Sequence, residues 1–374
     1  MLALLVAAAV LVLLVLLGAA AFHRRFSARR HAGPVSDHFD GERFHNLERV
    51  PDKTFGDILR WRRERGAEPW PAWIESEPGP PPEPRVAGGA LRATLVNHAT
   101  VLLQLDGLNL LTDPVWSERV SPVPWAGPRR HRAPGLRLDE LPPLDAVLLS
   151  HNHYDHLDVP TLRQLARRGP VPILTGLGNA EYLARFGVAG AAGGRVRELD
   201  WGDEIELPGG VRVVALPARH WSSRSPWDRA RSLWCSWVIE GPSGRVYVAG
   251  DSGYGGHFAA IGAAYGPFRL ALLPIGAFLP RWFMRDNHMA PDEALRAAEE
   301  LRAETSVVVH YGTFALGDDG PDRPLAELRV ALERAGSDAP RVVALEHGVG
   351  YDVPPAALSA SRPASPAASF APPG

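Results

Sequence analysis

Cysteine is almost absent from this chain of 374 residues, which contains Cys235 alone. A single cysteine excludes a disulfide within the chain, so cysteine usage leaves the compartment open. It also excludes a lipid-modified cysteine near the amino terminus. Lysine is equally rare, since Lys53 is the only one, and this bias together with abundant Ala, Arg, Gly and Pro is typical of a GC-rich bacterial source.

Net charge is nearly absent as well, because 40 basic residues face 42 acidic ones. A nucleic-acid-binding protein that works through bulk charge carries a basic excess, so we expect no nucleic-acid partner. With 374 residues, 45% of them hydrophobic, the chain can form one large domain, or two closely merged halves, with an ample core.

The first 22 residues carry no charged side chain. As a helix they would measure roughly 33 Å, which is enough to span a bilayer. Four arginines follow at once, and the positive-inside rule then places the rest of the chain in the cytoplasm. They are Arg24, Arg25, Arg29 and Arg30. We predict an uncleaved anchor in a bacterial inner membrane; the alternative is a signal peptide cut near residues 19–21 and a periplasmic protein.

Histidine is concentrated in the segment His151-Asn-His-Tyr-Asp-His-Leu-Asp158, directly after the apolar run 145–150. Four of its side chains are suitable ligands for a borderline metal such as Zn²⁺. They are His151, His153, Asp155 and His156. A turn after a strand lets alternate side chains converge, whereas positions i and i+2 of a helix do not share a face. The segment therefore predicts a metal site, with two metals, and metal-activated water chemistry.

Four later apolar runs also end in a residue that can bind a metal. Short β-branched runs bounded by Gly, Pro or polar residues are typical of buried strands. A ligand at the end of each run places its side chain at one rim of a sheet, where α/β enzymes build their sites. The four residues are His220, Asp251, His310 and His347.

The segment 151–156 matches the HxHxDH signature of the metallo-β-lactamase fold. Over roughly residues 36–350 the chain resembles, more closely, the N-acyl-phosphatidylethanolamine-hydrolysing phospholipase D family. Flanking segments carry this closer resemblance. They are Ser36-Asp-His-Phe-Asp-Gly41, Asn97-His-Ala-Thr100, Leu111-Thr-Asp-Pro-Val-Trp116, Ser121-Pro122, Gly250-Asp-Ser-Gly253, Trp282-Phe-Met284 and His310-Tyr-Gly-Thr-Phe-Ala315.

The resemblance implies two zinc ions, although N/O ligation of this kind also suits other divalent transition metals. It assigns one metal to three histidines and the second to an aspartate and two histidines, with Asp251 bridging. The first set is His151, His153 and His220, and the second is Asp155, His156 and His310. A metal-bound hydroxide would then attack phosphorus or a carbonyl carbon.

Further residues are expected to contact substrate or to orient the ligands. Asp251, Asp155 and His288 are the predicted catalytic residues, and His288 is expected to protonate a leaving group or to bind a phosphate oxygen. The predicted substrate-binding residues are Tyr154, His288 and His347.

Two aspartates have competing interpretations, and one histidine is expected to be structural. Asp113 and Asp158 either orient imidazoles through their second nitrogen or serve in turns and caps. We expect His98 to shape a tight turn between two strands.

The remaining pattern predicts an α/β fold, the αββα sandwich of the metallo-β-lactamase fold with an N-terminal transmembrane helix. Residues 1–22 would be the anchor, 23–89 a juxtamembrane linker and extension, 90–352 the hydrolase domain and 353–374 a disordered tail. Strands are expected at 91–96, 101–105, 108–112, 145–150 and 172–175 and, in a second series that begins near 196, at 204–207, 211–217, 233–240, 245–250, 270–275, 306–309 and 341–346; helices are expected at 158–168, 179–186, 291–303 and 324–335.

The leading functional hypothesis is a membrane-anchored phosphodiesterase that cleaves N-acyl-phosphatidylethanolamine to N-acylethanolamine and phosphatidic acid. Its partners would be the phospholipid, the bilayer and, as related phospholipases suggest, a second copy of the chain. One alternative is a lactonase or another phosphodiesterase of the same superfamily. A second is a non-catalytic metal-binding membrane scaffold, which would be expected to lack a ligand.

Overall fold

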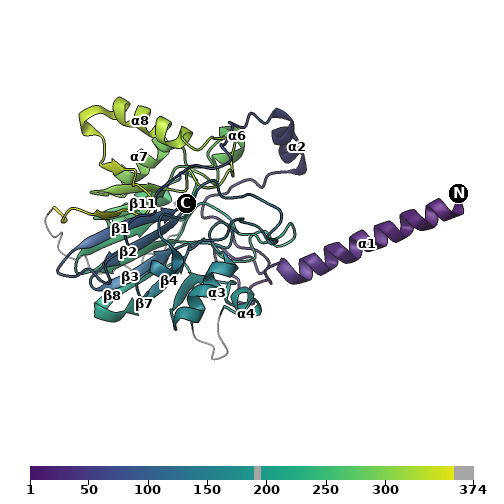
Figure 1. Ribbon diagram of the computed structural model, residues 1–374, viewed down its shortest axis with the longest axis horizontal. Helices are drawn as coiled ribbons and strands as arrows, with labels where there is room; N and C mark the ends of the chain where they lie inside the picture. The colour runs from purple at the N-terminus through teal and green to yellow at the C-terminus, as the bar shows by residue number, and fades with distance from the viewer. Residues whose placement is uncertain (189–194, 358–374) are drawn as a thin grey trace.

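Two seven-stranded sheets pack face to face, with helices on their outer faces, in the computed structural model, which describes residues 1–188 and 195–357 (Figure 1). The first sheet has the order β14 (Gly350–Asp352), β1 (Leu91–Asn97), β2 (Thr100–Leu105), β3 (Leu108–Thr112), β4 (Ala146–Leu149), β5 (Ile173–Gly176) and β6 (Val196–Leu199). The second has the order β13 (Val342–Val343), β12 (Ser306–Val309), β11 (Leu270–Pro274), β10 (Gly244–Val248), β9 (Ser236–Gly241), β8 (Val211–Leu216) and β7 (Glu204–Leu207).

Each sheet combines an antiparallel and a parallel part. Strands β1, β2 and β3 form an antiparallel meander, and β3 to β6 are parallel. In the second sheet β7 to β10 are antiparallel and β10 to β13 are parallel. Strands β1, β3 and β4 therefore run one way and end at one edge of the first sheet, and β8, β10 and β12 do the same in the second.

Side-chain alternation assigns the two faces of the first sheet. Leu103 of β2 and Leu148 of β4 belong to the large cluster between the sheets. Their neighbours Leu102 and Leu149 belong to a separate cluster, because successive side chains of a strand point to opposite faces. That outer cluster packs against α3 (Val159–Arg168) and α4 (Ala180–Arg185).

Helices α7 (Pro291–Glu300) and α8 (Arg323–Ala335) accompany the second sheet (Figure 1). Helix α5 (His257–Tyr265) contributes Phe258 and Ile261 to the same hydrophobic cluster as the strands of that sheet. Pro291 begins α7, with acidic residues in its first turn, as predicted. The αββα architecture expected from the sequence is confirmed. The shorter helical elements are α6 (Arg281–Met284) and the 3₁₀ turns η1 (Leu138–Glu140), η2 (Pro208–Gly210) and η3 (Gly336–Asp338).

Several element boundaries differ from the prediction. The strand expected at 341–346 pairs only at Val342–Val343, because the chain then leaves the second sheet and crosses to β14 at the edge of the first. The strand expected from 233 begins at Ser236. Helix α5 has no amphipathic stripe and was not predicted. Most of the predicted tail, 358–374, lies outside the described residues, whereas Val353 donates a backbone hydrogen bond to Leu91.

The N-terminal part consists of a projecting helix and an extension along the domain. Helix α1 (Leu2–Phe26) contains no buried residue and points away from the sandwich (Figure 1). By length and composition it can cross a membrane, a test that a signal sequence also passes. The extension after it includes α2 (Phe55–Glu64), and Phe39 and Phe44 pack with Trp234 in a small core cluster.

His38 fixes this extension to the domain. Its ring lies 2.6 Å from Asp37 Oδ1 and 2.7 Å from Asp200 Oδ1, with its centroid 4.5 Å from that of Trp201. Burial alone would lower the pKa of His38, but the hydrogen bonds and charges of Asp200 and Asp37 outweigh it and raise the pKa above its usual value.

We predict that His38→Gln destabilises the protein more at pH 6 than at pH 8.5. A histidine whose pKa is raised on folding stabilises the fold below its unfolded pKa, and this contribution is lost as the pH rises through the folded pKa. We expect a loss of about 1–2 kcal/mol at pH 6 and less at pH 8.5, measured by denaturant unfolding in detergent. Phe39→Leu, which removes packing from the small core cluster of the same extension, should cost the same at both pH values. Equal losses for His38→Gln at both pH values would contradict the charge assignment.

Candidate metal centre

The predicted ligands gather where strands of both sheets end. His151 follows β4, His220 follows β8, Asp251 follows β10 and His310 follows β12. All four strands run toward the same edge, so that the ends of two separate sheets supply one site. The structure brings together all seven predicted metal ligands. They are His151, His153, Asp155, His156, His220, Asp251 and His310.

Three imidazoles form the first group. His153 Nδ1 lies 2.9 Å from His151 Nε2 and 3.2 Å from His220 Nε2. His220 Nδ1 lies 3.0 Å from the carbonyl oxygen of Asn287, which can only accept. The proton of His220 is therefore on Nδ1, and its Nε2 lone pair faces the other two rings.

The second group contains one residue that the sequence did not assign to the site. Asp155 Oδ2 lies 3.3 Å from His156 Nε2, 3.4 Å from His310 Nε2 and 3.0 Å from His98 Nε2. His98 also shapes the turn between β1 and β2, as predicted, with φ of 47°. Its ring thus holds Asp155, while its carbonyl oxygen accepts a hydrogen bond from the backbone of His310.

Asp251 lies between the two groups. Five imidazole nitrogens surround one oxygen of its buried carboxylate. Asp251 Oδ2 lies 3.0 Å from His310 Nε2, 3.2 Å from His156 Nε2, 3.8 Å from His220 Nε2, 3.9 Å from His288 Nδ1 and 4.0 Å from His151 Nε2. This position is the one expected of a carboxylate that bridges two cations.

The nitrogen atoms that face Asp251 are better placed to bind metal ions than to form hydrogen bonds with one another. Several of them are buried without a hydrogen-bond partner, although they lie close together. These atoms are His156 Nε2, His288 Nδ1 and His310 Nε2, which lie 3.2, 3.9 and 3.0 Å from Asp251 Oδ2. Buried polar atoms rarely remain unpaired, and nitrogen and oxygen lone pairs directed at a common region are the donor set that divalent transition metals prefer.

The imidazoles of the first group are neutral. Burial lowers the pKa of His153 and of His220 to about 3. Burial also holds the pKa of His151 well below its usual value. Neutral rings keep the lone pair that a metal requires.

The two carboxylates require positive charge beside them. Burial alone would raise the pKa of Asp251, but His156 and His310 hold it well below its usual range. Burial alone would lower the pKa of His310, but the charge of Asp251 and the contacts with Asp155 outweigh it and raise this pKa to about 9. Divalent cations would supply this positive charge in place of protons on the rings.

Asp113 positions two of the ligands from outside. Its Oδ2 atom lies 2.8 Å from His156 Nδ1 and accepts a hydrogen bond from Ser150 Oγ, which in turn lies 2.9 Å from His151 Nδ1. Asp158 behaves differently, because it accepts hydrogen bonds from the backbone of Trp116 and Ser117. Asp113 therefore orients the imidazoles, whereas Asp158 serves in a turn as a cap for backbone nitrogens; these were the two predicted alternatives.

Asn46 was missed by sequence analysis. Its side chain accepts a hydrogen bond from the backbone nitrogen of His220 and donates one to the carbonyl oxygen of the same residue. Asn46 lies in the extension, 174 positions from His220, so no local pattern could have indicated the contact. The extension thus helps to position a ligand.

The predicted substrate residues lie at different distances from the cluster. His288 belongs to it, through a group that also contains His220 and Asp251, and burial lowers the pKa of His288 to about 3. Tyr154 is half-buried, and its hydroxyl donates a hydrogen bond to the carbonyl oxygen of Arg224.

His347 lies outside the cluster. Its Nδ1 atom is 2.9 Å from Arg132 Nη1, and its ring centroid is 6.3 Å from that of Tyr311. Tyr311 follows the ligand His310 directly, so His347 is near the site, as predicted, without facing the predicted ligands.

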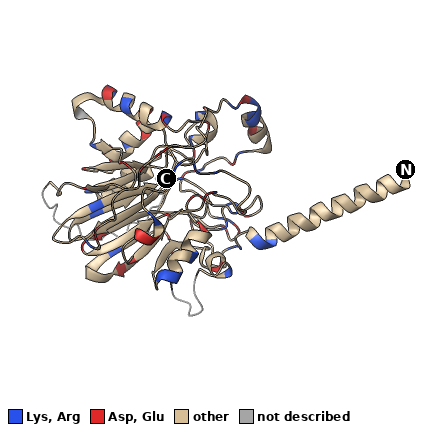
Figure 2. Cartoon of the chain, viewed as in Figure 1, with Lys and Arg blue, Asp and Glu red and all other residues tan. Residues whose placement is uncertain are grey.

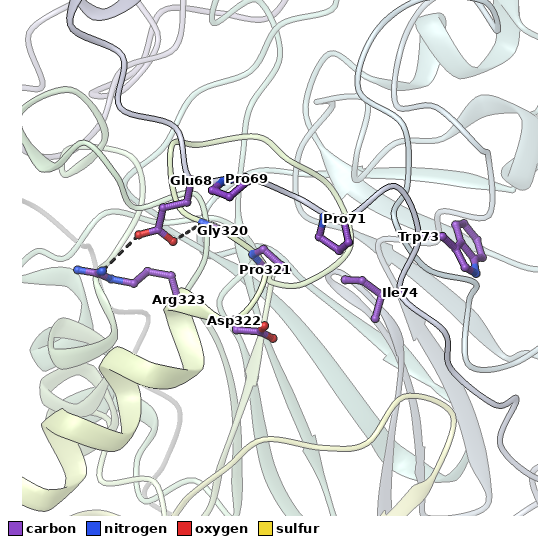
Figure 3. Close-up of a pocket in the computed structure, with 9 residues that line it drawn as sticks. All are labelled: Glu68, Pro69, Pro71, Trp73, Ile74, Gly320, Pro321, Asp322 and Arg323. Carbon is purple, nitrogen blue, oxygen red and sulfur yellow. Dashed lines mark hydrogen bonds and ion pairs between the residues drawn. The ribbon is translucent and has the colours of Figure 1, made fainter.

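The open side of the centre is marked by the half-buried His153, His288 and Trp221. The ring of Trp221 lies 4.4 Å from that of His153. A separate cavity of about 580 Å³ lies between residues 68–74 of the extension and the start of α8 (Figure 3). Its lining includes the Glu68–Arg323 ion pair and none of the predicted metal ligands, so it is not the metal centre.

Comparison with known proteins agrees with this geometry. The family model described as a beta-lactamase superfamily domain matches residues 108–311. The chain is 39% identical over 232 residues to the N-acyl-phosphatidylethanolamine-hydrolyzing phospholipase D 1 of Caenorhabditis elegans, covering 61% of this chain and 65% of that protein. The match thus spans slightly less than two thirds of that relative.

Two further comparisons extend over whole relatives. A UPF0173 metal-dependent hydrolase of Methanopyrus kandleri is 32% identical over 265 residues, covering 70% of this chain and 100% of that protein. The solved structure of Igni18, a metallo hydrolase from Ignicoccus hospitalis, covers 70% of this chain and 98% of its own, with a TM-score of 0.51 and 24% identity. That structural likeness supports the fold.

We predict that Asp113→Asn weakens metal binding about 10- to 100-fold, the usual effect of removing a residue that orients a metal-binding histidine. The asparagine can present its amide group to His156 Nδ1, which would then face a donor. Affinity is measured by competition with a chelator. Asp158→Asn is the matched control, because Asp158 caps backbone nitrogens in the same region. Equal effects of the two substitutions would contradict the role of Asp113.

Proposed function

Because the chain belongs to the beta-lactamase superfamily and is a metal-dependent hydrolase, we propose that it is a membrane-anchored phosphodiesterase of phospholipase D type. Its substrate would be N-acyl-phosphatidylethanolamine, which it would hydrolyse to N-acylethanolamine and phosphatidic acid. Two zinc ions would serve as cofactors.

The position of Asp251 between two groups of imidazoles is the observation that carries this proposal. One carboxylate oxygen lies within 4.0 Å of nitrogens from both groups. Such an arrangement suits two cations a few ångströms apart, which is the geometry of many phosphoester-cleaving enzymes. The first cation would be held by His151, His153 and His220.

The second cation would be held by Asp155, His156 and His310, with Asp251 shared between the two. Bound divalent metals lower the pKa of water and stabilise the negative charge that develops on a phosphoryl oxygen. His98, which contacts Asp155, would keep that carboxylate in place.

His288 would bind the substrate on the open side of the centre. Its unpartnered Nδ1 lies 3.9 Å from Asp251 Oδ2, so a phosphoryl group beside Asp251 is within its reach. A neutral imidazole there donates a hydrogen bond to a phosphoryl oxygen and orients the bond to be cleaved. Trp221 meets the ring of His153 edge to face and has the guanidinium of Arg229 4.0 Å from its own ring centroid, so it offers an apolar wall and a cation on the same side.

The substrate class rests on the relative from Caenorhabditis elegans and on the motifs that flank the metal ligands. Helix α1 adds support, because an anchor of its length would lie in the same bilayer as a lipid substrate. The helix carries no charge until its end next to the domain (Figure 2). Arg24 and Arg25 at that end favour a cytoplasmic domain.

Residues 1–22 would form the anchor and residues 90–352 the hydrolase domain. The bilayer and a second copy of the chain remain the proposed partners.

We predict that the full-length protein in detergent, with about two metals per chain, releases N-acylethanolamine and phosphatidic acid from N-acyl-phosphatidylethanolamine. Asp251→Asn should lose metal and activity together, because it removes a negative charge between the two groups. His288→Ala should retain the metals and lower kcat by roughly 10²–10³-fold. Metal content is measured by elemental analysis beside each assay.

Plain phosphatidylethanolamine and a sugar-phosphate lactone complete the substrate set. If the protein holds two metals per chain, cleaves the lactone and leaves the lipids intact, it is a lactonase and not a phospholipase. Well-folded protein without bound metal would contradict the ligand assignment itself.

A further inference from the structure

Arg224 closes the loop that carries three of the metal ligands. This arginine is buried, with 3% of its surface exposed. Its Nη1 atom donates hydrogen bonds to the carbonyl oxygens of Asn152, at 2.8 Å, and Leu157, at 3.0 Å. The ligands His153, Asp155 and His156 lie between these two residues, so one side chain fixes both ends of the ligand segment.

Two aromatic residues complete the surroundings of Arg224. Its Cζ atom lies 3.5 Å from the centroid of the Tyr154 ring, within the same ligand segment. Its Nε atom donates a hydrogen bond of 2.9 Å to the hydroxyl of Tyr182 in α4. The guanidinium therefore joins the metal-binding segment to α4.

Asp228 holds Arg224 in this position and also contacts the end of the anchor helix. Its Oδ1 atom accepts hydrogen bonds from the backbone nitrogens of Arg224, at 3.0 Å, and Ser225, at 2.8 Å. Its Oδ2 atom accepts a hydrogen bond of 2.6 Å from the backbone nitrogen of Ala28. Residue 28 is the second after the end of α1 at Phe26.

Further contacts hold the end of α1 against the same elements. Ser27 Oγ lies 2.6 Å from Ser225 Oγ, and the ring of His23 lies 5.6 Å from that of Trp227. From α4, Arg185 donates hydrogen bonds to the carbonyl oxygens of Arg24 and Ser27, which would otherwise be unpaired at a helix end. Figure 1 shows α1 meeting the domain beside α4.

We propose that Arg224 and Asp228 are positioning residues that couple the docked end of the anchor helix to the geometry of the metal centre. The path runs from Ala28 through Asp228 and Arg224 to the ends of the ligand segment. Ala28, Asp228 and Arg224 are all buried. The inference rests on the metal site of the proposed function and is independent of the lipid substrate.

Substitution of Arg224 by lysine tests the contact with the ligand segment. Lysine retains the charge, but its single ammonium group cannot reproduce the planar fork that reaches two carbonyls and a phenol. We expect Arg224→Lys in the full-length protein to weaken metal binding about tenfold. The visible absorption spectrum of the Co²⁺-loaded protein should change, because the coordination geometry changes.

Asp228→Asn tests the connection to the anchor and leaves Arg224 in place. With its carbonyl oxygen at the Oδ1 position, asparagine retains the bonds to the backbone of residues 224 and 225. Its amide then faces the backbone N–H of Ala28 and breaks that hydrogen bond. We expect roughly threefold weaker metal binding, a smaller effect than that of Arg224→Lys because the guanidinium contacts persist.

Asp106→Asn is the matched control. Asp106 also accepts hydrogen bonds from a backbone nitrogen and a serine hydroxyl, those of Ser243, but at the turn between β2 and β3, the opposite edge of the sheet. It should lower the melting temperature without changing metal affinity or the Co²⁺ spectrum.

Unchanged metal affinity and an unchanged spectrum in both Arg224→Lys and Asp228→Asn would overturn the proposal. If Arg224→Lys does not fold, the result for Asp228→Asn decides, with the same criterion. Because metal binding is measured without substrate, failure to cleave the lipid would refute the proposed function and leave this test intact.

Discussion

Two buried carboxylates, Asp155 and Asp251, set the main physical constraint on this protein. A buried negative charge costs several kcal/mol unless positive charge or hydrogen bonds accompany it, and here two lie within reach of the same imidazoles. The surrounding rings cannot satisfy both carboxylates as neutral groups. The cluster is therefore stable either with protons on His156 and His310 or with divalent cations, and the unpaired atoms that face inward favour cations.

The fold supplies this arrangement through the direction of its strands. Asp155 belongs to the segment after β4 in the first sheet, and Asp251 follows β10 in the second. Neither sheet alone holds a complete set of ligands, so the centre forms only when the two inner faces have packed together. The large cluster between the sheets, which includes Leu103, Leu148 and Trp237, thus positions the metal ligands as well as stabilising the domain.

Much of this could be predicted from sequence because the ligands follow short, strongly apolar strands and one segment contains four of them. What escaped prediction depends on distant residues. Asn46 and Arg224 act on residues 174 and 72 positions away, through backbone atoms that leave no sequence pattern. His98 was expected only to form a turn, because its second role arises from where that turn meets Asp155. Strand β14 was missed because it has three residues at a sheet edge, and helix α5 because its buried faces give no periodic polarity.

Helix α1, the proposed anchor, and the metal centre are joined by polar contacts in this structure. A flexible connection would be enough for an anchor that only retained the enzyme at a membrane, and residues 23–89 were expected to be a juxtamembrane linker and extension. Instead, Ser27 and Ala28 are buried, and each hydrogen-bonds to the loop that carries Arg224. A helix fixed in a bilayer and a rigid connection to the domain together restrict how the domain can orient. The open side of the centre, beside His288 and Trp221, would then keep a defined position relative to a lipid surface, as the proposed lipid substrate would require.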